Sequence, residues 1–257
     1  LASSTAAGPA FEGSSLTSGM RAALGAVSRA STDGYNLELS TIGDVPVKGI
    51  CGSGIVDLLA CLLDLGVVDQ TGRMLTADQD LRVSPEILQK LGEIDGLPLL
   101  RLGKKAAFTQ QDIRAVQLSK AAVQAAINIL LENAGLQAAD LERIIIAGGF
   151  GFHLNARNLE RIGLIPPGTG KKVEYAGNAS RSGCVWLLND IVYRRFLESR
   201  VNDIHHVSIA EHPRFMDLFV ECMDFPAALA KPIQSEESHE DQGNRPDDPE
   251  FPGAVRR

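Results

Sequence analysis

The sequence predicts an α/β fold, in which short buried strands alternate with helices. In residues 143–151, three β-branched residues run into a double glycine, directly after a segment of helical periodicity. A short apolar run bounded by turn residues is typical of a strand buried on both faces. A similar glycine turn leads into a helix at Gly52, and a strand, a glycine turn and a helix follow one another again at Gly177. The 257 residues, 44% of them hydrophobic, suffice for one large domain or two smaller ones.

Gly148, Gly149 and Phe150 follow the predicted strand at its carboxyl end. Glycines let the backbone turn sharply and let another group approach closely. In open α/β sheets, ligands bind beyond the carboxyl ends of the strands. We therefore predict that these three residues line a small-molecule site, with a nucleotide as the ligand. The alternative is a tight strand-to-helix turn without a ligand.

The composition of the chain argues against several classes of binding partner. The net charge of -7 argues against non-specific binding to nucleic acid or to anionic membranes, since both need basic patches. No apolar run reaches the roughly 18 residues that a membrane helix requires. The four scattered cysteines lack metal-ligand spacing, so we expect reduced core residues of a cytoplasmic protein and assign no metal site: Cys51, Cys61, Cys184 and Cys222. Because the first residue is Leu1 rather than Met, we expect a piece of a longer protein.

Residues 6–13 form the first segment with a distinct composition. Small residues, Gly and Pro predict a compact loop, in which Glu12 is the only ionisable group. In one interpretation the loop lies against a ligand, and Glu12 orients water or a metal ion. In the other it is a packing loop with Glu12 at the surface.

Gly52, Ser53 and Gly54 lead into an apolar helix, after predicted strands at residues 36–42 and 47–50. Free backbone N–H groups at the start of a helix suit an anion such as phosphate. The motif lacks the Lys of a P-loop and the third Gly of a dinucleotide fingerprint, and Ser53 could instead cap the helix. Asp57, one turn later, faces either the ligand or solvent.

The middle of the chain predicts an insertion followed by a long helix. Residues 67–108 are expected to form a small subdomain, with a helix that starts at Pro85 and a hairpin around Gly103. Thr109 is the predicted N-cap of the long helix, which has an acidic residue at its third position and ends at Gly135. Lys120 of this helix could reach a phosphate, although a solvated lysine is the stronger expectation.

The last part of the chain continues the alternation of strands and helices. We expect Asn155 to cap a helix over 156–162, and a strand over 172–176 to end in the Gly177-Asn178 turn. The next helix should pack through residues 183–188. A late strand at 207–210 and a helix at 215–225 follow. The predicted boundaries are 1–66 and 109–233 for two parts of one domain, 67–108 for the insertion, and 234–257 for a disordered acidic tail.

Four motifs in this order carry a family resemblance: Ala-Ala-Gly-Pro-Ala-Phe-Glu-Gly at 6–13, Gly-Ile-Cys-Gly-Ser-Gly at 49–54, Ile-Ala-Gly-Gly-Phe-Gly at 146–151, and Gly-Asn-Ala-Ser at 177–180. Together they resemble the carboxyl-terminal ATPase domain of the reductive activators of corrinoid proteins, over residues 1–210. This family belongs to the acetate and sugar kinase/heat-shock/actin (ASKHA) superfamily. The resemblance implies an actin-like, ribonuclease H-like fold, with a mixed sheet flanked by helices and an inserted helical and hairpin segment.

The resemblance also implies an activity. Such activators use ATP and Mg²⁺ to drive the reduction of cob(II)amide to cob(I)amide on a corrinoid protein or corrinoid methyltransferase. Their [2Fe–2S] cluster belongs to an amino-terminal ferredoxin domain, so it is expected only ahead of this chain. The superfamily's Asp-x-Gly-Thr phosphate loop would also lie just upstream of Leu1.

The resemblance assigns roles to the residues that match the motifs. Gly148, Gly149 and Phe150 belong to the adenosine motif, Gly52, Ser53 and Gly54 contact phosphate, and Gly177 and Asn178 form the second connecting motif. Glu12 is carried over as a group that orients water or magnesium, and Asp57 is the other candidate for a catalytic or magnesium-contacting carboxylate.

Two other functions compete with the activator. One is a nucleotide-sensing or dimerising scaffold without turnover, and a homodimer is an open option in either case. The other is a small-molecule kinase of the same superfamily, which needs a catalytic Asp against a substrate hydroxyl; the sequence offers no clear candidate for it.

Overall fold

The computed structural model describes residues 1–227. Its helices are α1 (Gly52–Asp64), α2 (Pro85–Lys90), α3 (Gln110–Ala134), α4 (Ala156–Arg161), α5 (Ala179–Asn189), α6 (Ile191–Arg200) and α7 (Phe215–Glu221). Its 3₁₀ turns are η1 (Ala10–Glu12), η2 (Ala138–Asp140), η3 (Gly151–His153), η4 (Gly170–Lys172) and η5 (Val201–Asp203). Its strands are β1 (Ala26–Thr32), β2 (Leu37–Thr41), β3 (Gly49–Ile50), β4 (Leu91–Ile94), β5 (Leu97–Arg101), β6 (Ala107–Thr109), β7 (Ile144–Ala147) and β8 (Val173–Gly177). The predicted α/β class is therefore confirmed.

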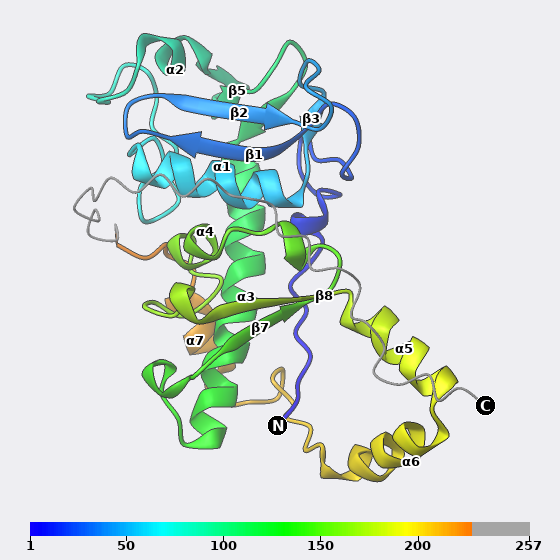
Figure 1. The fold of residues 1–257 in the computed structure, drawn as a ribbon. Coiled ribbons are helices and arrows are strands. Elements are labelled where there is room, and N and C mark those ends of the chain that lie inside the picture. The colour runs from blue at the N-terminus through cyan, green and yellow to red at the C-terminus, as the bar shows by residue number, and fades with distance from the viewer. Residues whose placement is uncertain (228–257) are drawn as a thin grey trace.

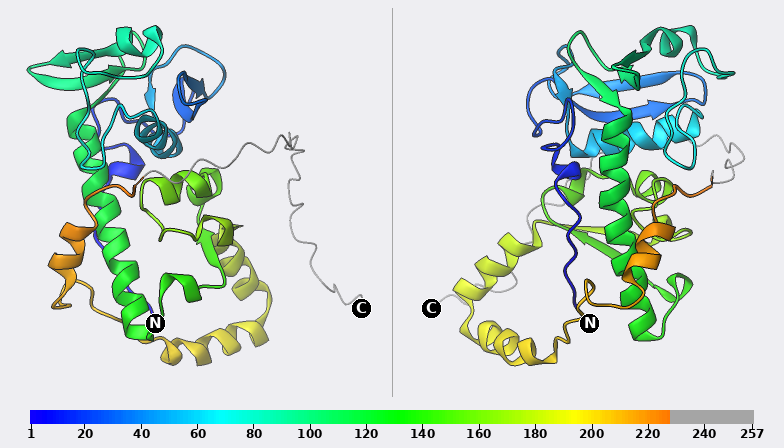
Figure 2. Two further views of the ribbon diagram at one scale, coloured as in Figure 1. Left: turned by 90° about the vertical axis from the view of Figure 1, so that its left-hand side faces the viewer. Right: turned by 180° about the vertical axis from the view of Figure 1, so that it is seen from behind.

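The strands form three small sheets, which Figure 1 shows along the long helix α3. In the first sheet, β1 pairs antiparallel with β2 and parallel with β3. The second sheet is the antiparallel set β4, β5 and β6, and it contains the predicted hairpin around Gly103. The third is the parallel pair β7 and β8. Helix α1 lies between the first sheet and the part of the chain that carries β7, β8 and α4 (Figures 1 and 2).

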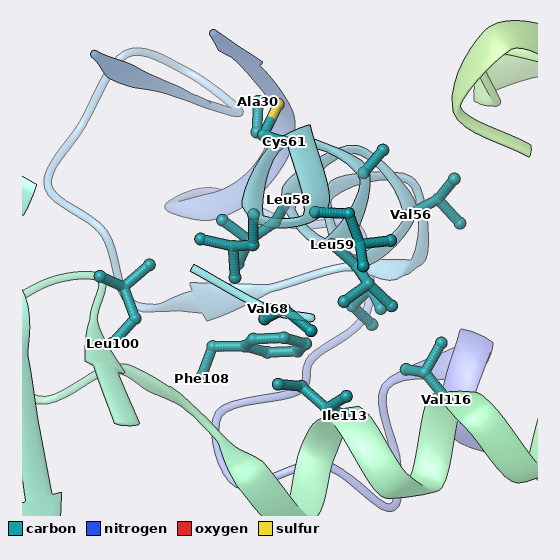
Figure 3. Close-up of a cluster of buried hydrophobic side chains, with 14 of the residues drawn as sticks. Ala30, Val56, Leu58, Leu59, Cys61, Val68, Leu100, Phe108, Ile113 and Val116 are labelled. Atoms are coloured by element: carbon teal, nitrogen blue, oxygen red, sulfur yellow. The ribbon is translucent and has the colours of Figure 1, made fainter. Parts of the chain in front are cut away.

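The main core surrounds α1. Every residue of α1 from Gly52 to Leu63 is buried, as expected for a helix that is apolar on all sides. Figure 3 shows Leu58 and Leu59 of α1 above Phe108 of β6 and Ile113 of α3. Burying each such side chain contributes about 1.5–3 kcal/mol, so this cluster fixes α1 against β1, β6 and α3.

The predicted helix boundaries are confirmed where a cap specifies them. The Thr109 hydroxyl accepts from the Asp112 N–H at 3.2 Å, and the Asp112 carboxylate accepts from the Thr109 N–H at 2.8 Å. The 25-residue helix α3 ends at Gly135, whose φ of 68° lies in the left-handed region. Pro85 opens α2 as predicted, and the Asn155 side chain caps α4 by accepting from the Arg157 N–H at 2.9 Å.

Several strand and helix predictions were wrong. The Ala- and Ser-rich segment 26–32 had no strand assigned, yet it is β1, because it is paired on both edges with its inward residues in the core. Residues 207–210 form no strand; the nearby chain has only an isolated bridge between Ala2 and His206. The helix predicted over 215–225 ends at Glu221, after which residues 222–226 run as a strap over α3.

Three buried side chains hold this strap, which we define as residues 222–226. Gln117 and Lys120 of α3 and Arg161 of α4 each donate to one of its backbone carbonyls, while the Phe225 N–H donates to the Gln70 carbonyl at 2.8 Å. Lys120 is fully buried and its ammonium lies 5.1 Å from the centre of the Phe225 ring. The expectation that Lys120 is solvated or reaches a phosphate was therefore wrong.

The part of the molecule around β7 and α5 is less covered than predicted. Burial alternates along β7, with Ile145 exposed, so β7 is not buried on both faces by the described residues. Helix α5 has no buried residue, which contradicts the predicted packing through 183–188. Cys184 of this helix is exposed, although the other three cysteines are buried as expected.

Two predictions concern long stretches of the chain. None of the described helices is both long and apolar enough to span a bilayer. The predicted acidic tail, 234–257, lies outside the described residues. The division into two domain parts with an insertion at 67–108 stays a prediction.

Candidate functional site

The glycine turns after β7 and β8 lie side by side. The two strands run parallel, and the Gly148 N–H donates to the Gly177 carbonyl at 2.7 Å. Gly148 has a φ of 108° and Gly177 a φ of 59°, a region that residues with a Cβ rarely adopt. The two turns that the sequence singled out are thus joined at one edge of this sheet, at the carboxyl ends of both strands.

These turns border open space. A Cβ atom added to Gly148, Gly149 or Gly177 would meet no heavy atom within 4 Å. The missing side chains therefore leave room that no other described part of the chain occupies. Asn178 is the N-cap of α5, and its side chain accepts from the Arg181 N–H at 3.1 Å, so its amide oxygen is engaged in capping.

Phe150 connects this edge to the start of α1. Its ring and the Phe11 carbonyl oxygen both occupy the place where a Cβ on Gly52 would be. Gly54 is likewise required for close packing, because its Cβ would overlap the Val27 carbonyl oxygen of β1. Three segments therefore converge: η1, the first turn of α1, and the turn after β7. Close packing already accounts for both glycines of the Gly-Ser-Gly motif.

Ser53 is not the cap of α1, and Glu12 is exposed, as one of the two interpretations of the loop over residues 6–13 predicts. Ser53 does not cap α1, since Cys51 is the N-cap; its hydroxyl donates to the Ser28 carbonyl at 2.9 Å. Glu12 is the last residue of η1, which packs on α1, and its side chain is exposed. Within residues 1–227 the Glu12 carboxylate has no hydrogen-bond or ion-pair partner, so it remains available to a ligand.

Asp57 faces a cavity rather than solvent. The cavity of about 560 Å³ lies between β1, β2, α1 and the connection from η3 to α4, and its walls are Arg29, Ala30, Ser31, Ser40, Asp57, His153, Leu154 and Asn155. Asp57 is 6% exposed, and its carboxylate accepts from Asn158 Nδ2 of α4 at 2.6 Å. Burial raises the pKa of Asp57, while the Asn158 amide, the Ala30 backbone and the Arg29 charge act in the opposite direction.

The cavity and the glycine turns share one segment of the chain. Residues 148–155 begin at the open turn after β7 and end in the cavity wall. The hydroxyl of Tyr175 in β8 donates to the Leu154 carbonyl at 2.5 Å, which fixes this segment against the sheet. A molecule bound at the turns would thus lie beside a segment that also positions the cavity wall at Asp57.

The charged groups determine which cofactors fit. Magnesium is usually held by one or two carboxylates together with substrate phosphates, a role that Asp57 or Glu12 alone can fill. A [2Fe–2S] cluster needs four cysteine thiolates, and the described residues contain no cluster of three or more metal-ligating side chains. Cys51, Cys61 and Cys222 are buried free thiols, and burial raises the pKa of Cys61 to about 12. These residues do not fit an iron–sulfur cluster.

Sequence reasoning missed several of the residues around this site. Asn158, Arg29 and His153 were not selected, because each comes from a different segment and only the tertiary fold brings them to Asp57. The predicted cap at Asn155 was the one local signal that located the start of α4. It did not indicate which way the side chain of Asn158, three residues later, would project.

The chain is similar to known proteins of one family. A family model described as the C-terminal domain of RACo, the ASKHA domain, matches residues 1–237. The corrinoid activation enzyme RamQ of Eubacterium limosum is 34% identical over 225 residues, which are 84% of this chain and 38% of RamQ. A [Co(II) methylated amine-specific corrinoid protein] reductase of Methanosarcina barkeri is 24% identical over 230 residues, 81% of this chain and 37% of the reductase.

A solved structure supports the same fold. The reductive activator for corrinoid, iron–sulfur protein superposes with a TM-score of 0.76 at 31% identity, over 87% of this chain and 36% of the activator. The chain thus spans less than two fifths of the length of each of these proteins. The actin-like, ribonuclease H-like fold expected from the motifs is confirmed by the match to an ASKHA domain.

Proposed function

The chain belongs to the family of the C-terminal ASKHA domain of RACo, and from this premise we propose that it is the nucleotide-binding part of an ATP-dependent reductive activator of corrinoid proteins. The observation that carries the proposal is the convergence of the glycine turns. Gly148 and Gly177 are joined by a hydrogen bond and face open space, and Phe150 links them to Gly52. Two relatives are named for corrinoid activation or reduction, which supports the same partner here.

The open turns at Gly148, Gly149 and Gly177 suit the adenosine part of the nucleotide. Backbone without side chains lets a flat base or a ribose approach within contact distance. The phosphates would extend towards η1 and the first turn of α1, where the helix dipole and the free Glu12 carboxylate are available. Mg²⁺ would then sit between the phosphates and either Glu12 or Asp57.

The whole reaction balances with one electron. The cobalt of a cob(II)amide gains one electron and becomes cob(I)amide, while ATP and water give ADP and phosphate. By the family resemblance, the electron comes from a low-potential [2Fe–2S] protein region ahead of this domain. This chain's own contribution is to bind the nucleotide, to orient water with Glu12 or Asp57, and to respond to hydrolysis by changing shape.

Nucleotide binding can be coupled to the corrinoid partner through the segments that meet at the site. A nucleotide held between η1 with α1 on one side and the turns of β7 and β8 on the other would favour the arrangement in which these parts are close. A ligand shifts a conformational equilibrium by its differential affinity for the two states. The affinity of the protein for its corrinoid partner would then differ between the two arrangements. We place this activity in the cytoplasm, where buried free thiols such as Cys51 and Cys61 stay reduced.

A kinase is the second candidate, and Asp57 is the observation that favours it. A buried carboxylate with a raised pKa at the wall of a polar cavity is suited to accept a proton from a substrate hydroxyl. A kinase would yield a phosphorylated small molecule. The activator would release inorganic phosphate in proportion to cob(I)amide.

Titration calorimetry of ATP and ADP with magnesium is the direct test of binding. It is done on the 257-residue chain and on the same chain preceded by the upstream part of RamQ, which is expected to supply a further phosphate loop. Binding by either protein, with phosphate release stimulated by a corrinoid protein and cob(II)amide reduction by the longer one, supports the proposal. If neither protein binds a nucleotide, the glycine turns are structural and the scaffold function is favoured.

A further inference from the structure

Helix α4 is joined to α1 by two polar contacts. Asn158 of α4 donates to the Asp57 carboxylate of α1 at 2.6 Å, and Arg161 Nε, one turn later, donates to the Asp64 carboxylate at 2.5 Å. The two aspartates are almost two helical turns apart, so they lie on one face of α1. Asn158 and Arg161 are three residues apart and share one face of α4. The orientation of α4 on α1 therefore determines both contacts.

The second contact continues to the strap, residues 222–226. Arg161 Nη1 donates to the Pro226 carbonyl at 2.9 Å, and the arginine side chain is 5% exposed. Figures 1 and 2 show the chain after α7 crossing to α4 at this point. Helix α4 has six residues, less than two turns, and a helix of that length has little stability of its own. Its position therefore depends on its buried side chains, which are Leu159 and Arg161.

The strap is fixed from its other side by α3. Gln117 Nε2 donates to the Met223 carbonyl at 3.0 Å and to the Thr71 carbonyl at 3.1 Å, and Lys120 donates to the Asp224 carbonyl. Both donors are fully buried. A buried donor that loses its partner destabilises the fold, so these bonds keep the strap in place on the long helix. The strap can thus act as a fixed support for Arg161.

The surroundings of Asp57 depend on where α4 lies. The Asn158 amide and the Ala30 backbone both act against the effect of burial on the Asp57 carboxylate. Ala30 belongs to β1, which is paired on both edges, whereas Asn158 belongs to the short helix α4. Arg29 and His153 are the other charged or titratable groups in the cavity wall. Of the two hydrogen-bond donors, Asn158 is therefore the one whose position relies on the anchoring of α4.

We propose that Arg161 is a positioning residue for the Asp57 carboxylate, and that the strap, by holding Arg161, is a structural component of the Asp57 cavity. Arg161 is not part of the cavity wall and acts through α4 and Asn158. Its effect on catalysis rests on the proposed function, in which Asp57 orients water or magnesium. The contact between Asn158 and Asp57 does not rest on it, so this contact is measured without a nucleotide.

Nuclear magnetic resonance of the 257-residue chain measures the contact directly. The signal of the Asn158 side-chain amide should shift as Asp57 titrates, because this amide is bonded to the carboxylate. Asp57→Asn should abolish the shift, which separates the titration of Asp57 from that of His153. Arg161→Ala should also abolish it, because α4 is no longer held in register with α1. An Asn158 signal that titrates in Arg161→Ala as it does in the wild type would overturn the proposal.

Arg157→Ala is the matched control, one turn earlier on the same helix. Arg157 lies 3.9 Å from the same Asp64 carboxylate, but its side chain is 63% exposed. The titration of the Asn158 amide should persist in this variant. Its loss in Arg157→Ala as well as in Arg161→Ala would show that the charge of Asp64 positions α4, and would overturn the role of the strap.

Two glycine variants test the strap from its own side. Gly163 and Gly168 have φ angles of 73° and 79°, so alanine introduces similar backbone strain at both. A Cβ at Gly163 would lie 3.1 Å from two ring carbons of Pro226, whereas a Cβ at Gly168 would meet no atom within 4 Å. Gly163→Ala should therefore displace the strap and weaken the Asn158 titration, and Gly168→Ala should not. If the arginine variant fails to fold, this pair decides, and equal titrations would overturn the proposal.

Turnover separates positioning from nucleotide binding, and it is measured on the chain preceded by the upstream part of RamQ. Arg161→Ala should lower turnover at saturating ATP by up to about a hundredfold, as a misplacement of about 1 Å does, without weakening ATP binding at the glycine turns. Arg157→Ala should change neither. If the wild type turns over no ATP, the proposed function fails while the Asn158 titrations still decide the positioning role. Lost titration with full turnover in Arg161→Ala would keep the contact but overturn its part in catalysis.

Discussion

The Nδ2 atom of Asn158 donates a hydrogen bond of 2.6 Å to Oδ1 of Asp57, and so joins α4 to α1 across the cavity wall. Asp57 is 6% exposed, and its burial raises its pKa. A buried carboxylate with an amide as its main partner does little for stability by itself. Asp57 at the wall of a polar cavity is therefore a candidate for binding or catalysis, and substitutions of it test this role.

Asp57→Asn should stabilise the protein increasingly as the pH rises above about 4, the ordinary pKa range of an aspartate. Because the folded-state pKa is raised, the folded protein binds more protons than the unfolded chain between the two pKa values, and wild-type stability falls with pH in this window. The asparagine does not titrate. Thermal unfolding from pH 3 to 8 should therefore give midpoint temperatures for the variant that exceed those of the wild type by an amount that grows with pH.

The same variant should lose activity if Asp57 orients water or magnesium. A positioned carboxylate of this kind typically contributes about a hundredfold or more, so ATP turnover in the longer protein should fall by about that factor.

Asp33→Asn is the control, since the Asn36 and Tyr35 amides lower the pKa of the exposed Asp33 to about 2. Its stability difference should have the opposite sign, with wild type favoured at neutral pH and the difference lost as pH falls towards 2. A stable, fully active Asp57→Asn enzyme would remove Asp57 from the site.

Gly149→Ala should weaken nucleotide binding without weakening the fold. A Cβ at Gly149 meets no atom within 4 Å, so the free protein accommodates it. If the nucleotide lies against this turn, the added methyl group should raise the dissociation constant of ATP about tenfold, equivalent to about 1.4 kcal/mol. Calorimetric titration measures this change.

Gly183→Ala is the matched control for Gly149→Ala. Gly183 lies in α5, also has open space around the added Cβ, and should gain about 0.5–1 kcal/mol of helix stability. It should bind ATP like the wild type. Equal affinities in all three proteins would place the nucleotide away from the turn after β7.

Sequence reasoning succeeded where a signal is local. The capping box of Thr109 and Asp112, the left-handed Gly135 and the cap at Asn155 each specify a helix end through neighbours in the chain. The glycine turns at Gly148 and Gly177 were located for the same reason. The sequence did not indicate that β7 and β8 pair, so the hydrogen bond between Gly148 and Gly177 came from the structure.

The failures have long-range causes. Lys120 was expected in solvent because lysine is rarely buried without a partner; its partner, the Asp224 carbonyl, lies 104 positions away. The contact between Asp57 and Asn158 spans 101 positions and leaves no periodic pattern in the sequence. The apolar run of β7 was predicted to be buried on both faces, and its exposure shows that the described residues alone do not complete its surroundings.

Lys120→Met should change how stability depends on pH. Burial lowers the pKa of Lys120 to about 8 from 10.5. Between these two values the unfolded chain binds more protons than the folded protein, so the free energy of unfolding of the wild type rises with pH. Relative to Lys120→Met, the gain across this window should be about 3 kcal/mol, from 1.36 kcal/mol per pKa unit.

Urea unfolding at pH 7.5, 9 and 10.5 measures this difference. Lys105→Met, which removes an exposed lysine, is the control and is measured over the same pH range. Parallel curves for wild type and Lys120→Met would mean that the ammonium stays solvated in solution. The strap would then not be held by a buried charge.

Arg161→Ala should be the most destabilising of the substitutions near the strap. Arg161 Nε lies 2.5 Å from an Asp64 carboxylate oxygen and Nη1 donates to the Pro226 carbonyl at 2.9 Å, with the arginine side chain 5% exposed. Arg161→Ala should cost about 1–3 kcal/mol, because the Pro226 carbonyl loses a charged donor, whereas the Asp64 carboxylate keeps access to solvent. Arg157 pairs with the same Asp64 at 3.9 Å but is 63% exposed, so Arg157→Ala should cost at most about 1 kcal/mol. Urea unfolding at 0.05 and 0.5 M NaCl separates the two, since salt screens only the exposed pair. Equal losses would show that charge on Asp64, rather than the anchoring of the strap, sets the effect.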